Sequence, residues 1–87
     1  MISSTTKSFR SRYEKLPLEV RQLARKNFKL WLHDPHHPSI QFKKVGKFWS
    51  ARVGLHYRAL ALMNGEACEW FWIGRHDEYE FIIGTRC

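Results

Sequence analysis

Hydrophobic residues near the start of the chain recur with helical spacing. Phe9, Tyr13 and Leu16 occupy positions i, i+4 and i+7, which is the apolar stripe of a short amphipathic helix. Thr6 lies just before this stretch and is a favourable N-cap, while Pro17 cannot continue a helix. The pattern therefore predicts a first helix between Thr6 and Pro17.

A second, longer helix is predicted over residues 17–32, because apolar residues continue at intervals of three and four. Its apolar stripe consists of Leu16, Val20, Leu23, Ala24, Phe28 and Trp31. Another side of this helix carries a basic ridge, which consists of Arg21, Arg25, Lys26 and Lys29. Such a ridge is typical of a solvated helix face, and the alternative is that it binds phosphate groups or a protein partner.

From Ser39 onward the period changes to two, which is typical of β-strands. Strand-like runs cover residues 40–43, 48–53, 57–63 and 66–73. Asn64-Gly65 separates the last two runs and is a strong hairpin signal. If the loop is those two residues, Met63 pairs with Glu66 and Tyr57 pairs with Trp72.

Cross-strand partners share a face, so this register predicts two different faces for the hairpin. We expect the helices to cover Tyr57, Ala59, Ala61, Cys68, Trp70 and Trp72. The opposite face is half apolar and carries Arg58, Leu60, Leu62, Ala67, Glu69 and Phe71. The tail segment 79–83 is expected to cover part of it.

The link between Arg52 and Tyr57 leaves two alternatives open. A three-residue loop, Gly54-Leu55-His56, pairs Arg52 with Arg58 on the half-apolar face, whereas a two-residue loop places the two arginines on opposite faces. The chain is expected to form one α+β domain, residues 1–87. Two N-terminal helices pack on one face of a small antiparallel sheet of three or four strands, and Ile2–Thr5 can add a short first strand.

Composition supports a packed domain, since 44% of the residues are hydrophobic and 15% are aromatic. No apolar run is long enough for a membrane span or a signal peptide, so we expect a cytoplasmic protein without membrane contact. The two cysteines, Cys68 and Cys87, form no CxxC pair and are interpreted as reduced thiols.

Positive charge is concentrated in the first three quarters of the chain. The net charge is +7, and residues 1–63 hold thirteen Lys and Arg against three acids. Residues 64–87 hold two basic residues and five acidic ones. This distribution favours contact with nucleic acid, and the alternative is a basic protein without a polyanionic partner.

The candidate chemistry lies on the strands and just after the last one. Basic candidates on or between strands are Lys43, Lys44, Lys47, Arg52 and Arg58, and the polar residues after the last strand are Arg75, His76, Asp77 and Tyr79. Arginine binds phosphate with two-point geometry, and histidine exchanges protons near neutral pH. These groups suit RNA cleavage through the 2′-hydroxyl. The histidines at 33, 36 and 37 match no metal-ligand spacing, so neither a metal nor another cofactor is expected.

Three segments in this order resemble the RelE/ParE family of toxins from bacterial toxin–antitoxin pairs. They cover residues 8–17, 48–60 and 72–79. The middle one is the most specific, because Trp49-Ser50-x-Arg52 is followed six residues later by Arg58 and an apolar strand. The resemblance spans nearly the whole chain and implies the RelE-like fold.

The resemblance to the RelE and YoeB branches implies ribosome-dependent mRNA cleavage. Arg58 matches the arginine that contacts the scissile phosphate, and Arg52 is similar to the arginine that supports phosphate binding. His76 falls where such toxins carry an Arg or His that acts on the leaving group or the phosphate. Tyr79 resembles the C-terminal tyrosine that orients or deprotonates the attacking hydroxyl.

The sequence departs from both branches at the general base. No glutamate stands in the strand before Trp49, where the YoeB-like branch has its base. Lys43, Lys44 and Lys47 lie near the lysine cluster of the RelE-like branch, with a different spacing to Arg58. The lysines are candidates for binding RNA, and the identity of the base stays open.

The resemblance also implies partners. These are a cognate antitoxin protein, the ribosome with its mRNA, and ribosomal RNA for the basic ridge of the second helix. The ParE branch keeps the fold but poisons DNA gyrase, so a gyrase poison is the alternative function. A non-toxic module that binds an antitoxin or nucleic acid is a further alternative.

Overall fold

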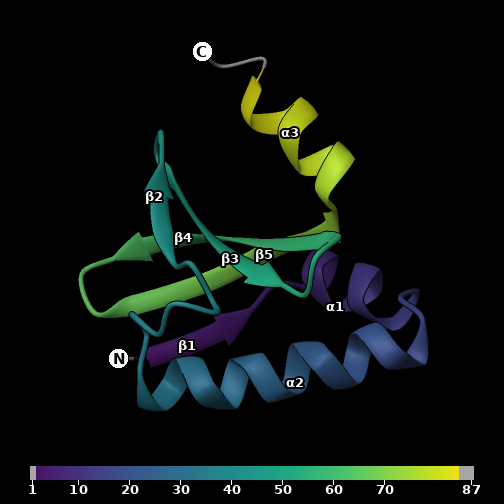
Figure 1. The fold of residues 1–87 in the computed structure, drawn as a ribbon. Helices are drawn as coiled ribbons and strands as arrows, with labels where there is room; N and C mark the ends of the chain where they lie inside the picture. Colours follow the sequence, from purple (N-terminus) through teal and green to yellow (C-terminus); the bar gives the residue numbers. More distant parts are fainter. Residues whose placement is uncertain (1, 85–87) are drawn as a thin grey trace.

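A computed structural model describes residues 2–84, without the side chains of residues 80, 81, 83 and 84. The prediction for Cys87 lies outside these residues. The elements follow one another as β1 (Ile2–Thr5), α1 (Lys7–Glu14), α2 (Leu18–His33), β2 (Lys43–Val45), β3 (Phe48–Val53), β4 (Tyr57–Asn64), β5 (Ala67–Arg75) and α3 (His76–Gly84). The order combines helices and strands in an α+β arrangement, as predicted (Figure 1).

The two N-terminal helices begin and end close to the predicted residues. The Thr6 hydroxyl accepts a hydrogen bond from the Phe9 amide at 3.1 Å, which confirms Thr6 as the N-cap of α1. Pro17 precedes α2, where its missing N–H leaves no helical hydrogen bond unmade. Asp34 follows the last residue of α2, and its carboxylate accepts the His36 amide at 3.3 Å.

The sheet has five strands in the order β1-β5-β4-β3-β2. Strands β2 to β5 are antiparallel, as predicted, and the possible first strand at Ile2–Thr5 is present as β1. Because β1 pairs with β5 in parallel, the sheet is mixed and has five strands, not the three or four antiparallel ones that were expected. The reason lies in the connection to α1, which packs on β5 near its C-terminal end, where the Arg12 side chain bonds the Ile73 carbonyl. Because β1 leads directly into α1, it runs toward that end together with β5.

Helices cover both faces of the sheet. Figure 1 shows α1 and α2 on one side and α3 on the other. We call the first side the helix-pair face and the second the α3 face. The core under the helix pair consists of Trp31, Ile40, Ala51, Val53, Ala59, Ala61, Cys68, Trp70 and Ile73. A smaller cluster under α3 consists of Leu60, Trp72 and Tyr79, with Phe48, Phe71 and Ile82 against it.

The β4–β5 hairpin differs from the predicted register. Met63 pairs with Cys68 rather than with Glu66, and a bulge lies between Leu60 and Ala61. An extra residue at a bulge reverses which face the following side chains occupy. Trp72 therefore pairs with Leu60 and packs on the α3 face, so its predicted place under the helix pair is wrong.

The strand predicted over residues 40–43 is also wrong. Ile40 is buried and Phe42 packs against the core, but β2 begins only at Lys43. Gln41 has a φ of 49°, a left-handed conformation that no strand accommodates. The alternation of apolar and polar residues here reflects the burial of Ile40 and the partial burial of Phe42, and these residues do not form a regular strand.

The C-terminal tail forms a third helix that the sequence analysis did not predict. Its first turn carries Asp77 and Glu78, which stabilise the positive end of a helix dipole. Tyr79 and Ile82 are three residues apart and pack on the cluster under α3. The prediction that the tail covers the half-apolar face is therefore confirmed, with a helix as the covering element.

Candidate functional site

The two strand arginines lie side by side on the α3 face. Arg52 in β3 pairs with Arg58 in β4, and Val53 pairs with Tyr57, which leaves a three-residue loop. Gly54 in that loop has a φ of 69°, a conformation that favours glycine. Of the two alternatives for this link, the three-residue loop is confirmed, and the two guanidinium groups share one face.

Each arginine is held by a carbonyl close to it in sequence. The Arg52 Nε donates to the Gly54 carbonyl at 3.0 Å, and the Arg58 Nη1 donates to the Tyr57 carbonyl at 3.1 Å. The Arg58 guanidinium also lies 5.7 Å from the centre of the Tyr79 ring, within cation–π range. These contacts restrain both arginine side chains on the α3 face.

Helix α3 brings the C-terminal candidates to the arginines. The His76 amide donates to the His56 carbonyl at 2.6 Å, which fixes the start of α3 on the loop between the two arginine strands. The rings of His76 and Tyr79 have centres 5.7 Å apart. His76, Tyr79 and Arg58, which are spread over two elements, therefore form one constellation.

Tyr79 is the most enclosed member of this constellation, with 5% of its surface exposed. Its hydroxyl donates to the hydroxyl of Ser50 at a long 3.4 Å, and Ser50 is itself buried. The ring packs with Leu60 and Trp72. In this arrangement Tyr79 offers its ring to Arg58 and turns its hydroxyl toward the sheet.

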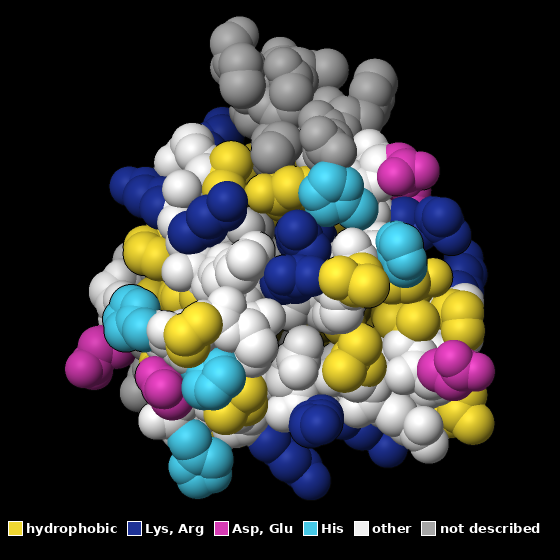
Figure 2. Space-filling view, viewed as in Figure 1, with side chains coloured by type: hydrophobic (Ala, Val, Ile, Leu, Met, Phe, Trp, Pro, Cys, Tyr) yellow, Lys and Arg dark blue, Asp and Glu magenta, His cyan; other side chains and the backbone are white. Residues whose placement is uncertain are grey.

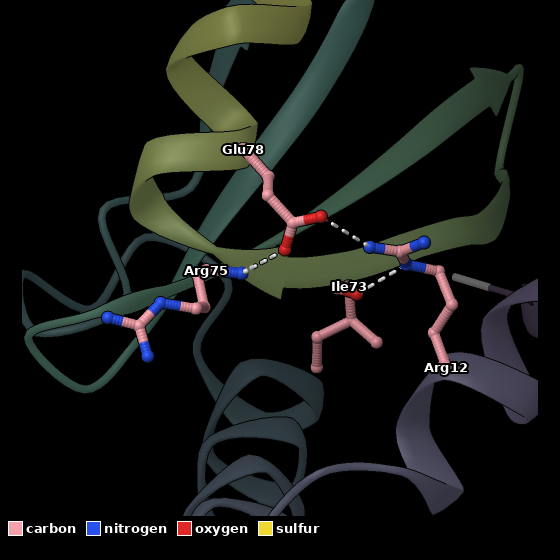
Figure 3. Close-up of polar contacts among 4 residues, drawn as sticks. All are labelled: Arg12, Ile73, Arg75 and Glu78. Atoms are coloured by element: carbon pink, nitrogen blue, oxygen red, sulfur yellow. Dashed lines mark hydrogen bonds and ion pairs between the residues drawn. The ribbon is translucent and has the colours of Figure 1, made fainter.

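A polar clasp joins the start of α3 to α1 across the end of β5 (Figure 3). Glu78 accepts the Arg75 amide through Oε1 at 3.4 Å and pairs with the Arg12 Nη2 through Oε2 at 3.3 Å. The Arg12 Nε donates to the Ile73 carbonyl at 2.9 Å, and its guanidinium lies 5.0 Å from the centre of the Trp72 ring. The clasp holds the first turn of α3, which carries His76.

The three lysines occupy different places. Lys43 pairs with Ser50, the residue that the Tyr79 hydroxyl contacts, so it shares the α3 face with the arginines. Lys44 pairs with Trp49, on the opposite face. Lys47 lies in the following turn, 5.9 Å from the centre of the Phe48 ring. Only Lys43 is brought to the arginine face by strand register.

The basic ridge of α2 lies on the far side of the molecule from this constellation. Arg25 donates through Nε to the Tyr13 hydroxyl at 2.9 Å, and that hydroxyl donates to the Arg21 carbonyl at 3.2 Å. Lys26 and Lys29 are exposed. Part of the ridge therefore ties α2 to α1, and part faces solvent.

A hollow of about 550 Å³ lies between the helix pair and the sheet. Its walls are mostly apolar and include Phe9, Phe28, Trp31 and Trp70, while Arg10, Arg21 and Arg25 also line it. Three lining nitrogens are buried without a hydrogen-bond partner among the described residues. They are the Nε of Arg21 and the indole nitrogens of Trp31 and Trp70. The hollow is separate from the arginine constellation.

One residue with a capacity for proton transfer was missed by the sequence analysis. His56 is exposed in the loop between β3 and β4, and its carbonyl receives the His76 amide. Its position between Arg52 and Arg58 is the signal that the sequence offered. The backbones of His56 and His76 thus meet at the loop that joins the two arginine strands, and Figure 2 shows Lys, Arg and His side chains gathered on the molecular surface near α3.

Other chemistries find less support in the described part of the chain. Burial raises the pKa of the Cys68 thiol to about 11, which keeps it protonated and a poor nucleophile near neutral pH. Within residues 2–84, no group of three His, Cys, Asp or Glu side chains is arranged to hold a metal ion. None of the described helices is both long and apolar enough to cross a membrane.

Neither a family model nor a curated protein matches the sequence. Solved structures do match. The YoeB/ParE toxin from Agrobacterium tumefaciens has 15% sequence identity and a TM-score of 0.69, over 87% of this chain and 99% of that one. A chain of the RelB–RelE antitoxin–toxin complex from Methanococcus jannaschii has 16% identity and a TM-score of 0.70, over 88% and 95%.

YafQ from Escherichia coli has 10% identity and a TM-score of 0.68, over 88% of this chain and 94% of that one. At such identities the likenesses establish the fold. The chain has the α+β fold of the RelE, YoeB and YafQ toxins, which confirms the RelE-like fold expected from the sequence.

Proposed function

We propose that this protein is the toxin of a toxin–antitoxin pair and that it cleaves mRNA on the ribosome, in the cytoplasm. The observation that carries the proposal is the pairing of Arg52 with Arg58, together with the Tyr79 ring that lies against both Arg58 and His76. A fold shared with RelE, YoeB and YafQ toxins supports it. So does the basic character of the chain, which suits an RNA substrate.

The proposed reaction is transfer of the phosphate within the RNA strand. The ribose 2′-oxygen attacks phosphorus while its proton passes to a base, the bond from phosphorus to the 5′-oxygen breaks, and an acid protonates that oxygen. The products are a 2′,3′-cyclic phosphate and a 5′-hydroxyl. Arg58 and Arg52 bind the phosphate oxygens and stabilise the charge that builds up on them.

The two histidines supply the proton transfers in this proposal. His76 protonates the leaving oxygen, in line with the role that the resemblance implies for it. His56 is the candidate base, because its loop carries it to the same end of the arginine pair and an imidazole can accept a proton from a hydroxyl. Lys43 binds a neighbouring phosphate, and Tyr79 supports Arg58 with its ring.

The test is expression of the chain in a bacterium, with mapping of new mRNA ends on stalled ribosomes. New ends are expected with the unaltered chain, and Arg58→Ala is expected to lower cleavage by about 10²–10³-fold because one charge-stabilising donor is lost. Lys7→Ala, an exposed change on α1, is the matched control. Growth arrest without new mRNA ends overturns the proposal, and DNA damage in that experiment identifies a gyrase poison instead.

A cognate antitoxin is the second part of this proposal. The hollow between the helix pair and the sheet offers apolar walls, unpaired donors and the charges of Arg10, Arg21 and Arg25. An acidic, amphipathic antitoxin segment would fill the walls and accept those donors. Its affinity should fall as salt rises, and Arg10→Ala with Arg25→Ala should reduce that salt dependence. An affinity that stays constant from low to high salt contradicts this choice of surface.

A further inference from the structure

A second basic pocket lies at the same end of the sheet as the arginine constellation, on the opposite face. It has a volume of about 280 Å³. Its lining comes from the end of α1, the start of β4, the end of β5 and the start of α3, and consists of Arg12, Lys15, Leu16, Tyr57, Ile73, Gly74, Arg75 and Glu78. Three cations and one carboxylate therefore surround a hollow that opens to solvent.

The charges in this pocket do not cancel. Glu78 forms an ion pair with Arg12 at 3.3 Å and accepts a hydrogen bond from the Arg75 backbone amide at 3.4 Å, so Arg12 balances its charge. Lys15 and Arg75 are exposed, and neither side chain makes an ion pair or hydrogen bond with any described residue. Two positive charges thus remain for a ligand, and the pocket suits an anion with several oxygens.

The pocket is built with a fixed wall. Arg12 cannot swing away easily, because its Nε is bonded to the Ile73 carbonyl and its guanidinium lies over the Trp72 ring. Gly74 forms part of the wall, and a Cβ there would lie 3.1 Å from the Arg12 Nη2 and 2.6 Å from the Trp72 ring. The close approach of these groups keeps the wall rigid without a ligand.

The chain geometry connects this pocket to the proposed active site. Gly74 pairs with Arg58, and the next two residues are Arg75, which lines the pocket, and His76, whose ring lies beside Tyr79 on the α3 face. A single RNA strand that crosses Arg58 and His76 and continues over the end of β5 reaches Arg75 and then Lys15. Phosphates repeat along such a strand, so a second one meets the pocket.

We infer that the pocket of Lys15 and Arg75 is a second phosphate site, which holds the backbone of the RNA strand next to the cleaved link. The inference rests on the proposed function for the identity of the strand. It predicts that the site contributes to affinity and to its salt dependence and leaves the chemical step unchanged, because both side chains line this pocket and are not part of the arginine constellation.

The experiment measures binding of a single-stranded RNA whose riboses carry 2′-O-methyl groups, so that no cleavage can occur. The double variant Lys15→Ala/Arg75→Ala should lower the slope of log K against log salt by about 0.7, which is the contribution of one neutralised phosphate on a single strand. Lys7→Ala, which removes an exposed charge elsewhere on α1, should leave the slope close to that of the unaltered protein. A thermal unfolding midpoint checks that each variant folds.

The outcomes separate the inference from the proposed function. A slope that falls in the double variant but not in Lys7→Ala supports the site, whether or not the protein cleaves RNA. An unchanged slope, or an equal loss in Lys7→Ala, overturns it. So does a double variant that binds RNA normally but loses an acidic peptide, because the pocket then serves a protein partner. If the slope falls but natural mRNA stays intact, the phosphate site stands and the proposed reaction fails.

Discussion

The two faces of the sheet use the same strands for different purposes. On the helix-pair face, β3 and β4 present small apolar side chains, Ala51, Val53, Ala59 and Ala61, that accept the Trp31 and Trp70 rings. On the α3 face, the alternate residues of the same strands are Ser50, Arg52, Arg58 and Leu60. One face is built for burial, and the other combines a small apolar cluster with charge.

The difference shows where stability and chemistry can be changed separately. Apolar burial stabilises through area removed from water, so its loss appears in the unfolding free energy. The charges on the α3 face are partly exposed and contribute little to folding, so their loss appears in RNA cleavage. Variants on the two faces should therefore change different measurements.

The largest expected effect concerns His76. His76→Gln should lower the rate of mRNA cleavage by about 10²–10⁴-fold, the usual contribution of a positioned proton donor. The melting temperature should stay near that of the unaltered chain. His33→Gln, an exposed change at the end of α2, is the control.

The pH profile of the same reaction tests His56. A base must be deprotonated, so His56→Gln should remove the acidic limb of a bell-shaped profile, whereas His76→Gln should remove the alkaline limb. Unchanged limbs in both variants would assign the proton transfers to other groups.

Trp31→Ala addresses the opposite face. Trp31 is 2% exposed and packs edge-on against Trp70 and Phe42, so its removal should lower the free energy of unfolding by about 3–5 kcal/mol. Urea denaturation measures the loss. Leu32→Ala, half exposed next to it, should change stability by less than about 0.5 kcal/mol. Cleavage per folded molecule should not change, and a large drop would show that the two faces are coupled.

Gly74→Ala should lower the free energy of unfolding by less than Trp31→Ala does. Gly74 lies at the end of β5, between Trp72 of the α3 face and Arg12 of α1. The added Cβ would lie 2.6 Å from the Trp72 ring, and the resulting overpacking should cost about 1–3 kcal/mol. Thermal unfolding measures the loss. A variant as stable as the unaltered protein would mean that Trp72 and Arg12 move aside readily and that the clasp is loose.

Tyr79→Phe should have the smallest effect. It removes one long hydrogen bond to Ser50 and keeps the ring under Arg58, so stability should fall by about 1 kcal/mol or less. Cleavage should stay within about a factor of ten. A loss of about 10²-fold or more would assign the hydroxyl itself to the reaction, as the resemblance implies for this tyrosine.

The sequence predicted the fold well where the structure of a segment depends only on residues that are close in sequence. The Thr6 cap and the break at Pro17 depend on neighbouring residues, and the structure confirms both. The predicted stripe of α2 is confirmed in part, since Trp31 is buried whereas Leu23 and Phe28 are exposed. The parallel place of β1 and the position of Trp72 depend on a distant strand and on a bulge, which leave no local pattern. Helix α3 was missed because its short apolar run also suits a covering segment.

In the candidate site, too, the sequence predicts which residue types are present but not the features that depend on distant segments. The spacing of Arg52 and Arg58 left their faces undecided until the loop length was known. Lys44 was grouped with Lys43 by sequence, but one residue along a strand reverses the face. His56 was passed over because its link to His76 runs between two segments that are distant in sequence.

The parallel pairing of β1 with β5 also bears on the order of events during synthesis. Ile2 pairs with Ala67 and Thr5 pairs with Trp70, so β1 cannot pair until β5 has been synthesised. Such pairings between distant segments slow folding, because a long loop must close before they form. A nascent chain therefore carries both arginines well before its sheet is complete and before α3 can deliver His76. The proposed activity therefore requires that the chain has left the ribosome at least as far as α3, residues 76–84.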